Sequence, residues 1–467
     1  MSKTLLLLAL LAGVITAQQI VWTRTFLDSS ATGPKVAVDT RGNVIVAAPP
    51  WLRKYGPDGD SLLWLKQVCL HLHTRVRVAT DREDNILLGI HGGYQDTTWT
   101  VTKLSPTGDS IWTWRTTWSS PPYPPSLTAI ATDSENRVLV TGYLHATYSS
   151  MWFTFRLGAG GAPDWMRTFA SGWGPDRAVA VSADPSDNVL VGGSRGIEGR
   201  NRQWFPLFVK YSPDGESLAA AVYVPDPDSS PAACLVAWSI AADPADNILL
   251  AGDGTIYSYT SPEGNWYGTF LFKHDPDGTA RWRWFSEENN VVGLSGWTGD
   301  GGAVSCRTDA AGNVLLVRAI YLPHGSLFLA ELREFRPDGE VAWVLRTMRL
   351  HLPLHPSVYS PRLSLALCPQ GDIVLAGRML GLSDTAYVQK VTRSPGVSEA
   401  DPVPDRGRGQ PATVRSGAGF RPPTGTFEVY DASGKLVIAP GRNDYPRLPA
   451  GIYFVRRQDT GESARLV

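Results

Sequence analysis

The chain has 467 residues, a formal net charge of −1 and 43% hydrophobic residues, with 46 Gly, 35 Pro and 17 Trp. A balanced charge without a long Lys/Arg run argues against nucleic acid as a partner. The high content of Gly, Pro and Trp favours many short strands joined by tight turns over a helical bundle.

Residues 1–17 predict a secretory signal peptide. Lys3 is followed by an apolar stretch from Leu5 to Val14 and by the small residue Ala17. This stretch is shorter than the roughly 20 residues of a spanning helix, so an uncleaved anchor is the weaker interpretation. No later segment is long and apolar enough to span a bilayer, so we expect no transmembrane span in the mature chain.

A phrase recurs through residues 18–396. "ADPSDNVLVGG" starts at Ala183 and "ADPADNILLAG" starts at Ala242. Related phrases start at Val36, Val78, Ala129, Cys306 and, in degenerate form, Leu365. Their Asn positions are 42 to 66 residues apart, and seven units of this period indicate a solenoid, propeller or array.

Each phrase reads as two short apolar strands joined by a turn in which Asp stands four residues before Asn. The Asp and Asn side chains can bond the turn backbone, and Asn or Gly tolerates positive φ. A calcium site is the weaker interpretation, because each turn offers one or two carboxylates where calcium takes six or more oxygens.

A second phrase in most units, such as "VKYSPDGESL" from Val209, has the P-D-G turn of a hairpin. Four strands per unit without a helical spacer predict a β-propeller blade. The seventh unit lacks an outer strand, whereas "IVWTRTF" at 20–26 precedes the first unit and matches "PDWMRTF" at 163–169. The sequence therefore predicts an all-β fold, a seven-bladed β-propeller closed by an N-terminal strand.

The two phrases resemble the SBBP-type β-propeller repeats of bacterial exported proteins and are similar in style to the NHL repeat. The resemblance covers residues 20–396. It implies that the first strand of each blade lines the central channel and that the fourth lies outermost.

Residues 397–424 are rich in Pro, Gly, Asp and Arg and predict a linker. Residues 425–467 then alternate apolar and polar residues, which predicts a small β-sandwich-like domain. The segments "YDASGKLV" and "LPAGIYFV" resemble the C-terminal sorting domain of the type IX secretion system. The matching positions taken as the sorting signal are Tyr430, Asp431, Gly434, Leu448, Pro449, Gly451 and Tyr453.

This resemblance implies the type IX secretion machinery as a partner. It also implies a location that is secreted or on the cell surface of a Gram-negative-type bacterium, with a tail that the machinery can remove. An ordinary accessory β-sandwich is the alternative interpretation of the same residues.

No motif of a hydrolase, zinc protease or nucleotide-binding protein occurs, so no catalytic residue, metal or cofactor is expected. His71 and His73 fall on one predicted strand face, where a metal is a weaker interpretation than a solvated pair. The four cysteines, Cys69, Cys234, Cys306 and Cys368, are far apart and are expected to be thiols in sheet positions, although export permits disulfides.

Two residue series remain as candidate sites. A basic residue precedes the P-D-G turn at Lys54, Lys103, Arg156, Lys210 and Lys273, with Glu334 in the sixth unit. A ring of cations around a pore is one interpretation, and packing of their stems between blades is the favoured one. Aromatic residues expected in loops are the candidate binding residues: Trp99, Trp152, Trp204, Tyr257 and Trp266. Aromatic side chains in loops suit the binding of a glycan or a peptide, although packing between blades explains these residues equally well.

The expected function is therefore an exported, non-enzymatic binding or structural module. The alternatives are a propeller hydrolase or lyase acting on extracellular polysaccharide, which a cluster of Asp, Glu or His at one channel mouth would favour, and a surface-layer component without a ligand.

Overall fold

The computed structural model divides the chain into two compact units, Met1–Ala400 and Asp401–Val467. In the larger unit the structure describes residues 20–27, 33–69, 75–91, 98–118, 125–145, 150–170, 176–197, 203–224, 232–257, 266–286, 304–322, 327–351, 363–379 and 385–393. In the smaller unit it describes residues 427–431, 436–438, 453–457 and 463–466. The regular structure in these ranges is all β-strand, and they contain no helix of the length and apolarity that crossing a membrane requires.

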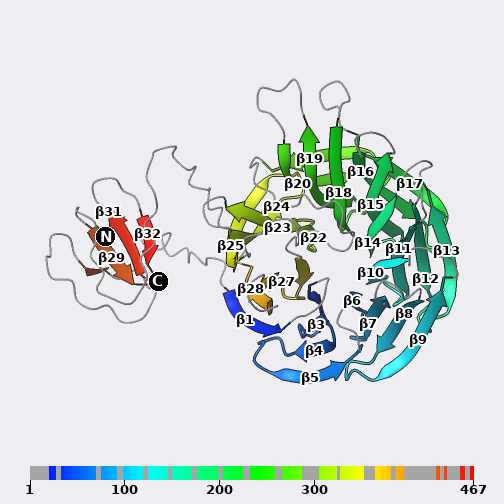
Figure 1. Ribbon diagram of the computed structural model, residues 1–467, viewed down its shortest axis with the longest axis horizontal. Coiled ribbons are helices and arrows are strands. Elements are labelled where there is room, and N and C mark those ends of the chain that lie inside the picture. The colour runs from blue at the N-terminus through cyan, green and yellow to red at the C-terminus, as the bar shows by residue number, and fades with distance from the viewer. Residues whose placement is uncertain are drawn as a thin grey trace, which may run out of the picture. The chain divides into compact units, whose positions relative to one another are not determined.

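The larger unit is a ring of antiparallel sheets, which confirms the β-propeller arrangement (Figure 1). Units one to three contain β2 (Lys35–Val38), β3 (Val44–Ala48), β4 (Trp51–Tyr55), β5 (Leu62–Gln67), β6 (Arg75–Thr80), β7 (Ile86–His91), β8 (Thr98–Leu104), β9 (Ser110–Thr117), β10 (Ser126–Thr132), β11 (Val138–His145), β12 (Ser150–Leu157) and β13 (Pro163–Phe169). Units four and five contain β14 (Arg177–Ala183), β15 (Val189–Ile197), β16 (Gln203–Tyr211), β17 (Ser217–Val222), β18 (Ala232–Ala242), β19 (Ile248–Tyr257), β20 (Trp266–His274) and β21 (Ala280–Phe285). Units six and seven contain β22 (Val304–Thr308), β23 (Val314–Leu322), β24 (Leu327–Phe335), β25 (Val341–His351), β26 (Ser364–Leu367), β27 (Ile373–Met379) and β28 (Thr385–Val391), with β1 (Ile20–Leu27) completing unit seven.

The expectation of seven separate blades is wrong in one respect. Five units are separate four-stranded sheets, whereas units four and five form one eight-stranded sheet. The join is a single parallel bridge between β16 and β18, at Trp204 and Cys234. It arises because both strands are long, with nine and eleven residues, so they come within hydrogen-bonding reach of each other across the blade boundary.

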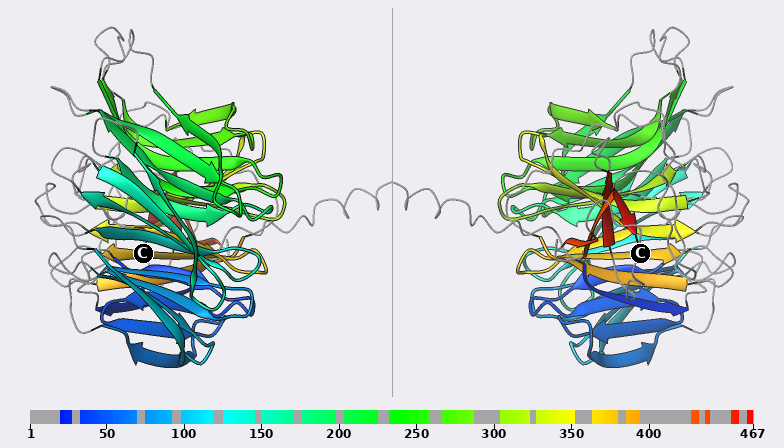
Figure 2. Two further views of the ribbon diagram at one scale, coloured as in Figure 1. Left: turned by 90° about the vertical axis from the view of Figure 1, so that its right-hand side faces the viewer. Right: turned by 90° about the vertical axis from the view of Figure 1, so that its left-hand side faces the viewer.

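Closure by the N-terminal strand is confirmed. β1 pairs antiparallel with β28, from Ile20 opposite Val391 to Leu27 opposite Thr385. Figure 1 shows the blue β1 beside the orange β28, and the side views of Figure 2 show blue and orange strands together at the same part of the ring. The two ends of the propeller are thus joined by main-chain hydrogen bonds.

The core of the propeller lies between neighbouring units. Middle strands such as β3 and β16 are buried on both faces, because each sheet is covered by a neighbour on either side, whereas β4 and β8 alternate buried and half-buried residues. The cluster between units two and three contains Val101 of β8, Leu127 of β10 and Phe155 of β12. The outermost strands, such as β9, alternate exposed and half-buried residues and face solvent along one side.

The Asp turns connect the first and second strands of each unit as the sequence predicts. Oδ1 of Asp184 accepts hydrogen bonds from the backbone N–H groups of Ser186 at 3.0 Å and Asn188 at 2.8 Å. Positive φ falls on Asp187, one residue before the expected Asn position. The equivalent residues with positive φ are Gly42, Asp84, Asn136, Asp246, Gly312 and Gly371.

The smaller unit contains one described sheet, in the order β30 (Leu436–Ile438), β29 (Phe427–Asp431), β31 (Tyr453–Arg457) and β32 (Ser463–Leu466). The second layer of the expected β-sandwich is not among its described residues. Residues 1–17 and the linker at 397–424 lie outside the described ranges.

Candidate functional site

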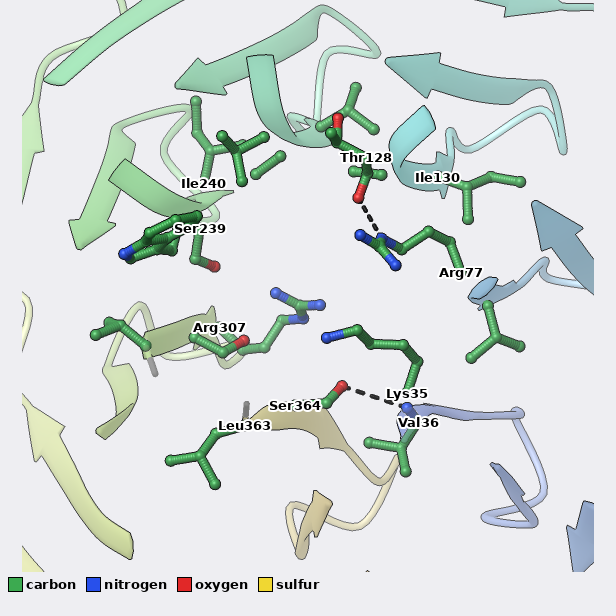
Figure 3. A pocket seen from close by; sticks show the side chains of 18 residues that line it. Lys35, Val36, Arg77, Thr128, Ile130, Ser239, Ile240, Arg307, Leu363 and Ser364 are labelled. Carbon is green, nitrogen blue, oxygen red and sulfur yellow. Dashed lines mark hydrogen bonds between the residues drawn. The ribbon is translucent and has the colours of Figure 1, made fainter. Parts of the chain in front are cut away.

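The innermost strands of all seven units enclose a central cavity of about 140 Å³. Three basic residues line it: Lys35 of β2, Arg77 of β6 and Arg307 of β22. Figure 3 shows their charged ends pointing into the enclosed space from different strands. None of the described residues that line this cavity is acidic.

β-Bulges decide which residues face the cavity in units three to five. The register of the first strand against the second skips Thr128, Val179 and Trp238, and all three line the cavity. Opposite each bulge stands a glycine: Gly142, Gly193 or Gly252. A Cβ on any of these would lie 2.0 Å from a carbonyl oxygen, so the last Gly of each phrase permits the bulge.

Hydroxyl groups around the cavity join neighbouring units. Thr128 Oγ1 lies 2.9 Å from Ala178 O of unit four, and Ser239 Oγ accepts from the backbone N–H of Cys306 at 3.0 Å. Ser364 Oγ accepts from the N–H of Val36 at 3.3 Å (Figure 3). These hydroxyls therefore tie the ring together.

The three cations differ in their surroundings. Arg77 is buried and donates to the carbonyl oxygens of Thr128 and Val76, and Figure 3 shows the first of these bonds. Arg307 donates to Cys306 O at 2.8 Å and keeps part of its side chain in contact with solvent inside the channel. Desolvation by the surrounding channel wall lowers the pKa of the Arg307 guanidinium from its usual value, although the side chain is exposed to solvent. The position of Arg307 therefore disfavours an isolated charge.

Trp238 is fixed from behind by a buried acid. Its Nε1 donates to Oδ1 of Asp253 at 2.7 Å. Burial of Asp253 raises the pKa of its carboxyl to about 7, although the bond from Trp238 lowers it. The indole that lines the cavity is thus held by a carboxyl group that titrates near neutral pH.

A second hollow, of about 460 Å³, lies where the first strands end, at the mouth with the Asp turns. Five aspartates line it and would be candidates for acid–base chemistry: Asp81, Asp133, Asp184, Asp187 and Asp243. Asp187 accepts hydrogen bonds from the backbone N–H and the hydroxyl of Ser134. Each of the other four forms an ion pair with the basic residue of its own unit. The pairs are Lys103–Asp81, Arg156–Asp133, Lys210–Asp184 and Lys273–Asp243, each at 2.8 Å, and Lys54–Asp39 in unit one at 2.9 Å.

These ion pairs show that the basic series does not form a ring of cations around the pore. Lys54 Nζ also donates to Pro106 O in the P-D-G-type turn of the next unit, at 3.2 Å, and Trp64 Nε1 donates to the same oxygen at 3.1 Å. Lys273 and Trp282 repeat this arrangement on Pro337 O. The basic series therefore lies between units, as the favoured interpretation expected, and the tryptophans of the outer strands serve the same contact.

Unit six has an acidic residue at the position of the basic series, and a basic residue at the end of unit seven compensates for it. Glu334 occupies the position of the lysine, and Arg393 bonds both Glu334 at 2.7 Å and Asp309 at 2.5 Å. The cation missing from unit six thus comes from the end of unit seven.

The predicted aromatic binding residues need correction. Trp99, Trp152 and Trp204 lie in β8, β12 and β16 rather than in loops, and all three are buried. Trp99 packs against Trp118 with ring centroids 5.4 Å apart and donates to Pro125 O at 3.1 Å. Packing explains them because the third strand is enclosed between neighbouring units. Tyr257 and Trp266 lie in β19 and β20, and their side chains are outside the described part.

The remaining candidates give no reactive centre among the described residues. His71 and His73 lie outside them, and no group of three or more His, Cys, Asp or Glu within them could hold a metal. Cys234, Cys306 and Cys368 are free thiols, and burial raises the pKa of Cys234 and of Cys368 to about 11. Both thiols are therefore protonated at neutral pH.

The sorting-signal residues fall partly within the smaller sheet. Tyr430 and Asp431 are in β29 and stand opposite Phe454 and Tyr453 of β31. The two segments that carry the resemblance are therefore adjacent strands. Gly434, Leu448, Pro449 and Gly451 are outside the described residues.

The cations of the cavity were not predicted from the sequence. Lys35 and Arg77 each stand four residues before the turn Asp, and Arg307 stands two before it. Alternation along the first strand puts these positions on one face, which was the available signal. Bulges at the equivalent positions of units three to five hide that signal.

No protein-family model matches the chain, and no curated protein matches it. Among solved structures, a streptogramin B lyase has 10% sequence identity and a TM-score of 0.42, covering 79% of this chain and 98% of its own. A protein of unknown function from Dyadobacter fermentans has 9% identity and a TM-score of 0.44, covering 81% and 99%. A polysaccharide lyase has 9% identity and a TM-score of 0.46, covering 78% and 90%. The likeness to these proteins is one of fold.

Proposed function

We propose that this protein is an exported, non-enzymatic binding module that holds an extracellular ligand in the central channel of its propeller. The observation that carries this proposal is the convergence of Lys35, Arg77 and Arg307 on one cavity, with no carboxylate among the described residues that line it. Cations grouped in a partly apolar channel attract a ligand of opposite charge.

The arrangement at the Asp-turn mouth supports binding over hydrolysis. A cluster of acids is present there, as the polysaccharide hydrolase or lyase alternative requires. Four of these carboxylates, those of Asp81, Asp133, Asp184 and Asp243, each form an ion pair and accept hydrogen bonds from their own turn. Asp243, for example, pairs with Lys273 and accepts hydrogen bonds from Asn247. Burial opposes ionisation of Asp243, but these bonds outweigh it and hold the pKa of the carboxyl below its usual range. Asp243 is therefore a poor proton donor at neutral pH, whereas burial raises the pKa of Asp133 in the same hollow.

Delivery outside the cell is the second part of the proposal. It is supported by the signal-peptide pattern of residues 1–17 and by the pairing of β29 with β31, which places the two sorting-like segments side by side. The proposed partner is the type IX secretion machinery, and the proposed location is the surface or the medium of a Gram-negative-type bacterium.

Two measurements test these parts. The full chain and a chain lacking residues 425–467 are expressed in a bacterium that has type IX secretion, and we expect only the full chain outside the cells. Thermal shift of the purified chain against glycans, peptides and organic acids should reveal a ligand, since binding to the folded state raises Tm. Retention of the full chain in the periplasm would reject the sorting role, and turnover of a polysaccharide would reject the non-enzymatic one.

A further inference from the structure

Building on the proposed function, we propose that the cavity at the channel centre binds a compact organic carboxylate, whose acidic groups contact Lys35, Arg77 and Arg307. This site is distinct from the hollow at the Asp-turn mouth, whose lining includes five aspartates.

The charges occupy one arc of the ring. Arg307 belongs to unit six, Lys35 to unit one and Arg77 to unit two, and only Ser364 of unit seven and its neighbour Leu363 line the cavity between the first two. Guanidinium groups match carboxylates through paired N–H donors, and an ammonium adds a third point of charge. Two or more acidic groups would therefore be matched by this arc.

The opposite arc is largely apolar. Units three to five contribute Ile130, Val179, Trp238 and Ile240. A phosphate or sulfate ion has no carbon skeleton to cover this surface, whereas an organic acid does. The charged arc and the apolar arc together favour an organic anion that has both acidic groups and an apolar carbon skeleton.

The size of the cavity limits the ligand. At about 10–15 Å³ for each water molecule, its volume of about 140 Å³ has room for roughly ten waters. A small polycarboxylate or one acidic sugar residue therefore matches the space better than a folded peptide does.

Arg307 is the residue with most to gain from an anion. Its side chain is the most exposed of the three lining cations, and its hydrogen bond to Cys306 O uses one of its five N–H donors. A bound carboxylate would supply both a partner and a compensating charge.

The test is isothermal titration of the full chain at low salt with citrate, galacturonate and inorganic phosphate. We compare the wild type, Arg307→Gln and the matched control Arg336→Gln, which removes an exposed arginine from the unit-six turn. We expect at least one carboxylate to bind, with Kd raised tenfold or more by R307Q and less than twofold by R336Q. Citrate and galacturonate distinguish a polycarboxylate from an acidic sugar as the source of the carboxylate.

Arg307→Lys keeps the charge without the paired donors, so it serves if R307Q does not fold, and we expect it to weaken binding about threefold or more. Carboxylate binding that neither variant changes would overturn the site, and phosphate binding as tight as both carboxylates would overturn the organic class. If the three anions fail while a glycan or peptide raises Tm, the inference falls and the proposed binding function stands. If no ligand of any kind binds, both fall.

Discussion

Lys273 Nζ lies 2.8 Å from Asp243 Oδ2, and the side chains are only 1% and 4% exposed. The same ammonium donates to Pro337 O, so one cation connects the inner turn of unit five, its own strand and the next unit. Lys273→Met should destabilise the propeller by about 3–5 kcal/mol, because it leaves a buried carboxylate without its partner. Urea unfolding measures this.

The control for that prediction is the exposed pair Arg336–Glu340, at 3.0 Å. Arg336→Met should cost less than about 1 kcal/mol, as surface ion pairs do. The double variant K273M/D243N should recover part of the loss. Equal losses from K273M and R336M would contradict the structural role of the buried pair.

The charge reversal in unit six predicts a rescue. Glu334→Lys places a second cation beside Arg393, and we expect a marked fall in Tm because both compete for Asp309. Adding Arg393→Gln should restore Tm toward the wild-type value, since the new lysine then has the same partner as in other units. A double variant no more stable than E334K would refute this compensation, and differential scanning fluorimetry decides it.

The glycines opposite the bulges predict that the loss of stability on Gly→Ala substitution depends strongly on position. Gly193→Ala brings a Cβ to 2.0 Å from Arg177 O and 2.8 Å from the Trp152 ring, so backbone must shift. We expect a loss of about 3 kcal/mol or more, in the range of severe overpacking. Gly160→Ala is the matched control because its Cβ meets nothing within 4 Å. Chemical denaturation of both variants gives the comparison, and similar losses would contradict it.

Asp253 predicts a pH effect on stability. Its folded pKa is raised to about 7, so between about pH 4 and 7 the unfolded chain loses this proton while the folded chain keeps it. Asp253 therefore lowers the free energy of unfolding by roughly 1.4 kcal/mol for each pH unit in that window, and this destabilisation is constant above it. Asp253→Asn removes the cost, so its Tm advantage over the wild type should be larger at pH 8 than at pH 5.

Asp277→Asn is the control for this pH effect. Hydrogen bonds from Thr279 lower the pKa of the exposed Asp277, so it is already ionised across this window. We expect its Tm difference from the wild type to be the same at pH 5 and pH 8. An advantage of D253N that does not change with pH would show that Asp253 does not titrate there.

Ring closure predicts the effect of removing β1. Deletion of residues 20–27 leaves one edge of β28 without its partner, and exposed strand edges pair with other chains. We expect lower Tm and self-association on size-exclusion chromatography, both reversed by the peptide IVWTRTFL. Deletion of residues 425–467 should leave Tm unchanged. A monomeric, equally stable deletion variant would contradict closure through β1.

The repeats made the propeller predictable, because a strand, an Asp turn and a P-D-G turn each depend on local chemistry. Even closure could be predicted, since "IVWTRTF" looks like an outer strand without a unit. The fusion of units four and five could not, because it depends on a single long-range bridge at Trp204.

The candidate site was predicted poorly for a related reason. Tryptophans such as Trp99 suggest a ligand surface when only residue type is considered, but their burial depends on the neighbouring unit. Alternation can place Lys35 and Arg307 on the inner face of their own strands, but only ring closure brings them together at one cavity. Contacts between units far apart in the chain are what local patterns leave out.

The position of β28 has a mechanical consequence. In the other six units the last strand in the chain is the outermost one, such as β25, and it is hydrogen-bonded along one edge. Because β1 takes the outer place in unit seven, β28 lies between β1 and β27. Tension on the chain that follows Val391 therefore pulls on a strand clamped along both edges. A tether attached at that end would load the propeller through an inner strand instead of an outermost one.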